Sequence, residues 1–241
     1  MSILSAGTFI GALCAGSLAD SLGRRYSIML SCFIFAAGVP MQTASTSVGL
    51  LVGGRVIAGL GVGGVSAIVI LYVSEISPKR IRGTLVSGYQ FALTMGLLIA
   101  SSVNQGTHSC GNYSSYRIPI ALQLVWTFIL ASGLFLLPGS PRWLVKKGRL
   151  QDARAALTCV RGQPAGFESE YIEAELAEIH ANYEYELAIA SDSWLNPFKG
   201  GFKPSGNLRR VLVETSLQMF QQWTGVNFIC KWCAPGALKG S

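Results

Sequence analysis

The stretch GGRVIAGLGVGGVSAIVILYVSEISPKRIRG (53–83) decides the fold of this chain. From Val48 to Tyr72 the sequence is almost entirely apolar. A helix of roughly 20 mostly apolar residues is long enough to cross the hydrocarbon core of a bilayer. Charged side chains return directly afterwards, at Glu75, Lys79, Arg80 and Arg82. The stretch therefore predicts a membrane-spanning helix that ends in a charged, water-facing connection.

The composition of the whole chain agrees with a membrane protein. Of its 241 residues 50% are hydrophobic and 13% are charged, whereas about 25% are charged in an ordinary soluble domain. Mean hydropathy is +0.43. Charges are scarce up to Leu137 and frequent from Pro138 to Arg210, which indicates a membrane block followed by a water-exposed block. The net charge of +7 does not indicate a nucleic-acid partner, because the basic residues lie at the ends of apolar runs.

Six segments are long and apolar enough for membrane helices: 2–19, 27–44, 48–72, 84–103, 117–137 and 208–230. The predicted fold class is therefore all-α, with about six transmembrane helices and a helical segment outside the bilayer. The predicted domains are five helices in 1–137, a cytoplasmic helical linker in 138–207, a further span in 208–230 and a divergent tail in 231–241.

The distribution of lysine and arginine orients these helices. The connections 20–26, 73–83 and 138–207, with the start of the last span, hold most of the 19 basic residues, and the opposite connections hold none. The charged connections are therefore assigned to the cytoplasm. The opposite connection, 104–116, contains Asn112 in a glycosylation sequon.

The polar block contains a repeat typical of an amphipathic helix. Apolar residues recur there at spacings of three and four: Ile172, Leu176, Ile179, Tyr183 and Leu187. A shorter helix is predicted over 151–161, ended by Gly162 and Pro164.

Three features of the membrane block have a direct physical interpretation. Gly59 and Gly63 have the G-x-x-x-G spacing that lets helices approach closely; no strand precedes them, which argues against a nucleotide-binding loop. Arg55 within a membrane segment should be paired or should snorkel to the interface. At the charged end, Glu75 and the arginines either form ion pairs that break in another conformation or make a static surface cluster.

Five motifs follow one another along the chain: GRR (23–25), GRxxxGxGxG (54–63), YxxExxPxxxRG (72–83), PxSPRWL (138–144) and QQxxGxN (221–227). In this order and spacing they resemble the sugar porter family of the major facilitator superfamily, and most of all fungal monosaccharide (hexose) transporters. The resemblance implies two halves that rock about a substrate site near the midplane of the membrane. The six segments resemble the second to seventh of the family's twelve helices, and 138–207 resembles its intracellular helical domain.

The resemblance also implies roles for particular residues. Sugar hydroxyls would be bound by the side-chain amides of Gln90, Gln221, Gln222 and Asn227, which can donate and accept hydrogen bonds without carrying charge. Hydrogen bonding between helices is the alternative for these amides. The cytoplasmic gate would consist of Arg24, Arg25, Glu75 and Arg82. Gly139 departs from the family's usual glutamate, and Arg55 matches a position beside an acidic residue of the first helix in proton-coupled members; proton coupling is not assigned.

The expected function is monosaccharide transport by alternating access, in the plasma membrane, with the sugar and the lipid bilayer as partners. The chain itself is expected to be a truncated form, inactive alone, since only one helix of the second half is recognised. A sugar sensor and a non-transporting partner of an intact porter are the alternatives. No enzyme and no cofactor are expected. Cys230 and Cys233 have zinc-like spacing without a second ligand pair, so no metal site is expected.

Overall fold

The computed structural model describes residues 2–45, 47–78, 80–108, 114–162, 170–189 and 207–223. These residues form helices and no strand, which confirms the predicted all-α class. The helices are α1 (Ser2–Leu22), α2 (Arg24–Thr43), α3 (Val48–Ile76), α4 (Arg82–His108), α5 (Ser114–Leu136), α6 (Pro141–Lys146), α7 (Leu150–Val160), α8 (Glu170–Ile189) and α9 (Asn207–Trp223). The chain divides into two units, Met1–Tyr183 and Glu184–Ser241, which are described separately.

Four helices in the described part of the chain are long and apolar enough to cross a membrane: Ile3–Leu22, Arg24–Thr43, Val48–Ile76 and Arg82–Val103. They correspond to the first four predicted spans. Leu122–Leu136 in α5 and Val211–Phe220 in α9 are shorter apolar stretches. α9 covers the beginning of the predicted span 208–230, and 224–230 lie outside the described residues.

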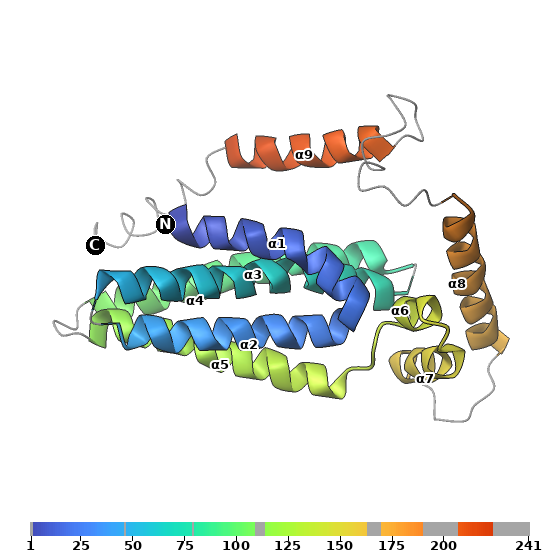
Figure 1. Cartoon of the computed structure of the whole chain (residues 1–241), viewed down its shortest axis with the longest axis horizontal. Coiled ribbons are helices and arrows are strands. Elements are labelled where there is room, and N and C mark those ends of the chain that lie inside the picture. Colours follow the sequence, from blue (N-terminus) through green and yellow to red (C-terminus); the bar gives the residue numbers. More distant parts are fainter. Residues whose placement is uncertain are drawn as a thin grey trace. The chain divides into compact units, whose positions relative to one another are not determined.

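Within the first unit, α1 to α5 lie side by side with their axes roughly parallel, and α3 packs against both α1 and α2 (Figure 1). Glycine makes the contact between α1 and α3 possible. A β-carbon at Gly59 would lie 2.7 Å from the carbonyl oxygen of Leu4, and one at Gly63 would overlap the carbonyl oxygen of Thr8. The close approach that the G-x-x-x-G spacing predicts is therefore confirmed, with α1 as the partner helix.

The opposite side of α3 packs on α2 in the same way. A β-carbon at Gly61 would lie 2.7 Å from Cβ of Phe35, and one at Gly38 of α2 would lie 2.6 Å from the backbone nitrogen of Ala58. The side-chain amide of Gln42 donates to the carbonyl oxygen of Gly54 (3.1 Å). Toward the charged end the three helices share a core with α5: Ala15, Ala19, Ile28, Cys32, Ile68, Tyr72 and Leu134.

The helices after residue 138 build a second, smaller core. α7 ends at Val160, two residues before Gly162, whose φ of +69° favours glycine; the predicted short helix is confirmed. Ile172 of α8 is 1% exposed. Leu176, Ile179 and Tyr183 of α8 pack against Leu144, Val145, Ala153 and Ala156. Leu187, predicted on the same apolar face, is 57% exposed, so the packed face of α8 ends at Tyr183.

Candidate functional site

The site begins at the sharp turn between α1 and α2. Gly23 has a φ of +91°, a left-handed conformation that side chains other than glycine rarely adopt. Its backbone N–H donates to the carbonyl oxygen of Ala19 (3.1 Å), which closes the last turn of α1. A β-carbon at Gly23 would lie 3.2 Å from the indole ring of Trp143. Glycine is required here both for the turn and for the close approach of α6.

The turn places Arg24 between the ends of three helices. Its Nη2 lies 3.0 Å from Oε1 of Glu75 near the end of α3, and the two side chains are 10% and 7% exposed. Its Nε donates to the same carboxylate oxygen (3.2 Å). Its Nη1 donates to Asp20 Oδ1 (3.1 Å) and to the carbonyl oxygen of Ala19 (3.3 Å), both at the end of α1. One buried guanidinium therefore joins the end of α1, the start of α2 and the end of α3.

A fourth segment, the connection from α5 into α6, is bound to the same place. Ser140 Oγ donates to Oε2 of Glu75 (2.5 Å), and Ser140 is 1% exposed. The hydroxyl of Tyr72 donates to the carbonyl oxygen of Pro138 (2.6 Å). The indole N–H of Trp143 donates to the carbonyl oxygen of Asp20 (3.0 Å). Asp20, Arg24, Glu75 and Ser140 together form the charged cluster.

The energetics of the charged cluster depend on all its members being together. Both carboxylate oxygens of Glu75 are used, one by Arg24 and one by Ser140. A buried ion pair is stable only when its polar atoms are satisfied, and removing one partner typically costs about 3–5 kcal/mol. Because each member comes from a different helix or connection, separating these segments would break the whole set at once and return its charges to water.

The structure brings together two of the four residues predicted for the gate, Arg24 and Glu75. Arg25 Nη2 donates to the carbonyl oxygen of Phe135 (3.0 Å), and its Nε is buried without a hydrogen-bond partner. Arg82 makes no ion pair with any described residue, and its Nε is likewise buried and unpartnered. The roles of Arg25 and Arg82 remain predictions.

Sequence reasoning missed the contact that Ser140 makes. The motif comparison pointed to Gly139, the residue before Ser140. A β-carbon at Gly139 would lie 3.8 Å from Leu144 and would meet nothing closer. Ser140 is instead the N-cap of α6, followed by proline in the first turn. That pattern predicts a helix start, but its contact with Glu75, 65 residues away, follows only from the fold.

The other predicted residues lie away from the charged cluster. Arg55 is half-buried near the start of α3, with no carboxylate in contact among the described residues. Gln90 is exposed on α4. Gln221 and Gln222 belong to the last turn of α9, in the second unit, and nothing is described of their side chains. Asn227, Asn112 and the cysteine pair of the tail lie outside the described residues.

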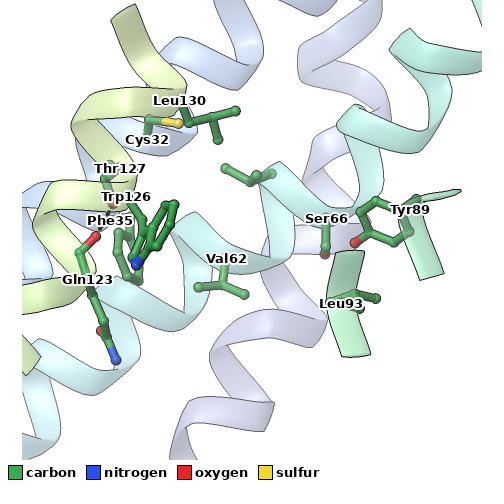
Figure 2. A pocket seen from close by; sticks show the side chains of 11 residues that line it. Cys32, Phe35, Val62, Ser66, Tyr89, Leu93, Gln123, Trp126, Thr127 and Leu130 are labelled. Carbon is green, nitrogen blue, oxygen red and sulfur yellow. Dashed lines mark hydrogen bonds between the residues drawn. The ribbon is translucent and has the colours of Figure 1, made fainter. Parts of the chain in front are cut away.

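An apolar cavity of about 380 Å³ lies between α2, α3, α4 and α5. Figure 2 shows Gln123, Trp126 and Thr127 of α5 on one side of it and Tyr89 and Leu93 of α4 on the other. Gln123 and Trp126 also line a second cavity of about 500 Å³ between α4 and α5. The packing between α4 and its neighbours is thus open, and Gln123 is an amide within it that sequence reasoning did not single out.

Comparison with known proteins identifies the architecture. The family model described as "Sugar (and other) transporter" matches residues 1–232. The chain belongs to this sugar transporter family. It is 46% identical over 229 residues to the major facilitator-type transporter ecdD of Aspergillus rugulosus, covering 95% of this chain and 41% of that protein. It is also 46% identical over 230 residues to the high glucose sensor RGT2 of Saccharomyces cerevisiae, covering 95% and 30%.

Solved structures show the same fold. The proton:xylose symporter XylE of E. coli, solved with 6-bromo-6-deoxy-D-glucose bound, superposes with a TM-score of 0.79 at 25% identity. The match covers 96% of this chain and 50% of XylE. The chain therefore spans about half of that transporter, and 30–41% of the two curated relatives. It is an integral, multi-pass membrane protein with a partial major facilitator fold, as the motifs predict.

Proposed function

We propose that the protein to which these residues belong carries a monosaccharide across the plasma membrane by alternating access. Membership of the sugar transporter family supports this proposal. So does the fold shared with a xylose symporter that binds a glucose derivative. The charged end of the bundle faces the cytoplasm in this proposal, because the basic connections lie there.

The observation that carries the proposal is the buried pair of Arg24 and Glu75. Alternating access needs an element with two discrete arrangements whose free energies differ by only a few kcal/mol. The charged cluster suits such an element, because pairing offsets the desolvation of its charges when the segments are together, and water would solvate them when the segments separate. In the arrangement described, the end of α3 and the α5–α6 connection are joined through Glu75. We assign this arrangement to a closed cytoplasmic gate, to which Arg25 and Arg82 are also proposed to belong.

The sugar is bound, in this proposal, by Gln90 of α4 together with Gln221, Gln222 and Asn227. Amide side chains suit a neutral polyol because each donates and accepts. Gln90 is exposed on its helix and its side chain is available to a ligand. The place of these four amides in the family's motifs supports the assignment.

Uptake of labelled glucose tests the proposal, in a host without hexose transporters of its own that expresses the protein to which these residues belong. Gln90→Ala should raise KM roughly tenfold, because hydroxyls that lose a partner cost about 1–2 kcal/mol of binding. Gln151→Ala, an exposed glutamine on α7, is the matched control and should leave KM unchanged. A Gln90→Ala protein with unaltered KM would remove Gln90 from the site.

A sugar sensor is the second candidate, favoured by the 46% identity to RGT2. Transport and sensing share the binding step and differ in the event that binding triggers. A sensor would bind glucose and induce a glucose-responsive reporter without uptake, whereas a transporter would support uptake in the same host. A partner role, in which the protein only assembles with an intact porter, predicts neither result in a host without other porters.

A further inference from the structure

A third cavity, of about 340 Å³, lies beside the charged cluster and has charged groups in its lining. Its walls come from the α1–α2 turn, the α5–α6 connection, α6 and α7, all within the first unit. Arg24, Arg25, Arg149 and Asp152 supply the charged groups of its lining. We propose that this cavity binds a phosphomonoester anion, supplied by a phosphoinositide headgroup or by a soluble sugar phosphate.

The charges of the lining do not balance. Arg24 is already paired with Glu75 and Asp20, and Arg149 with Asp152 (Nε to Oδ2, 2.7 Å). Arg25 has no carboxylate partner among the described residues. Its Nη2 is bonded only to a backbone carbonyl, and its Nε is a buried donor without any partner. A guanidinium without a counter-charge attracts an anion, so Arg25 provides an unpaired cation in the lining of the cavity.

The backbone at the same place also favours an anion. Gly23, Arg24, Arg25 and Tyr26 all line the cavity, and they include the first residues of α2, a helix of 20 residues. The first N–H groups of a helix have no partner within it. The N-cap Gly23 has no side chain to supply one. Uncapped N–H groups and the positive end of the helix dipole add to the attraction of Arg25.

A phosphomonoester fits this combination better than a carboxylate. It carries close to two negative charges at neutral pH and three acceptor oxygens, so it can satisfy a guanidinium in bidentate fashion and still accept from backbone N–H groups. A cavity of this size lies in the range of small-molecule sites. Basic pockets near the ends of membrane helices also bind phosphorylated headgroups, so both sources share one chemistry.

The cavity lies between the α1–α2 turn and the segment after α5, which the charged cluster also holds together. Arg25 belongs to α2, and Arg149 is the N-cap of α7. An anion that contacts both would bind only when α6 and α7 rest against the α1–α2 turn. Anything that binds one folded arrangement stabilises it, so the ligand should raise Tm by an amount that grows with its concentration relative to Kd.

Binding of the probe to the purified full chain in lipid nanodiscs is the test. One arm titrates inorganic phosphate and glucose 6-phosphate, and the other adds phosphatidylinositol 4-phosphate to phosphatidylcholine discs. Both arms record affinity and Tm. Arg25→Gln should weaken binding roughly tenfold or more, because it removes a charge-assisted donor. Arg142→Gln, an exposed arginine of α6 outside the cavity lining, is matched in charge and should change affinity less than twofold.

Asp152→Asn distinguishes a specific site from loss of folding. It frees Arg149 from its partner and should tighten binding several-fold, a gain that a misfolded protein does not give. Binding in either arm with this order of affinities supports the proposal and identifies the source. No binding in both arms, or equal weakening by Arg25→Gln and Arg142→Gln, would overturn it.

Discussion

Two regions of the bundle are made of similar residues and pack in opposite ways. In α3, glycines at 59, 61 and 63 meet the backbone or side chains of neighbouring helices at distances that exclude a β-carbon. In α4, glycines at 83, 88 and 96 have nothing within 4 Å of where a β-carbon would stand. At these positions of α3 the helices could not pack as closely with any residue larger than glycine, whereas the three glycines of α4 have space beside them. Neither glycine content nor spacing by itself therefore predicts a close helix contact, since Gly49 and Gly53 of α3 also have the G-x-x-x-G spacing and nothing lies within 4 Å of their β-carbon positions.

This difference in packing agrees with the two roles proposed above, a gate formed by the charged cluster and sugar binding by α4. The tightly packed helices α1, α2 and α3 hold Arg24 and Glu75 in one geometry. The loosely packed α4 carries Gln90 and borders two cavities. A fixed charged end and an adaptable α4 are what a gate and a ligand-binding helix respectively require. Substitutions in the two regions should therefore differ in the size and sign of their effects.

Glu75→Gln should have the largest effect, because it leaves the buried guanidinium of Arg24 without its main counter-charge. We expect a loss of about 3–5 kcal/mol in the free energy of unfolding, measured by denaturant titration in detergent micelles. Arg24→Gln should cost a similar amount. The double variant should cost clearly less than the sum, because the pair is then removed as a unit. Strict additivity would show that the two side chains do not interact in the folded protein.

Gly63→Ala should destabilise the tightly packed region by about 1–3 kcal/mol, because the added methyl group overlaps the carbonyl oxygen of Thr8 and forces α1 and α3 apart. Thermal unfolding in the same micelles measures this loss. An unchanged Tm would mean that the contact between α1 and α3 has more room than described.

Ser140→Ala should cost about 1–2 kcal/mol, since it removes both a hydrogen bond to Glu75 and the N-cap of α6. Ser74→Ala is the matched control, because the hydroxyl of Ser74 bonds only to the carbonyl oxygen of Leu71 in its own helix. Hydrogen exchange of the α6 amides provides the measurement. Equal protection of α6 in the two variants would contradict a role for Ser140 in holding this segment.

Gly96→Ala should have the smallest effect and the opposite sign to Gly63→Ala. Nothing lies within 4 Å of the new methyl group, and alanine favours a helix over glycine by up to about 1 kcal/mol. The expected result is a Tm equal to or slightly above that of the unaltered protein. A Tm lowered as far as that of Gly63→Ala would abolish the contrast between the two regions.

Much of the fold follows from the sequence, because apolar length and the positions of the breakers are local properties. The α3 span, its glycine face and the short helix before Gly162 are of this kind. The pairing of Arg24 with Glu75 could be predicted only as one of several partnerships at the charged end. The hydrogen bond of Ser140 to Glu75 could not be predicted, because the two residues are 65 positions apart and meet only when α6 packs against the end of α3. Leu187 shows the same limit: its spacing fits the apolar face of α8, but the core beneath that face ends earlier.

The central claim is that the pair of Arg24 and Glu75 closes a transport path and opens during each cycle. Exchange of the two charges tests it most directly, with uptake of labelled glucose as the measurement in a host without other hexose transporters. The account predicts that Arg24→Glu and Glu75→Arg each abolish uptake and that the double exchange restores a substantial part of it. Full uptake by either single variant, at equal amounts of protein in the membrane, would contradict the claim.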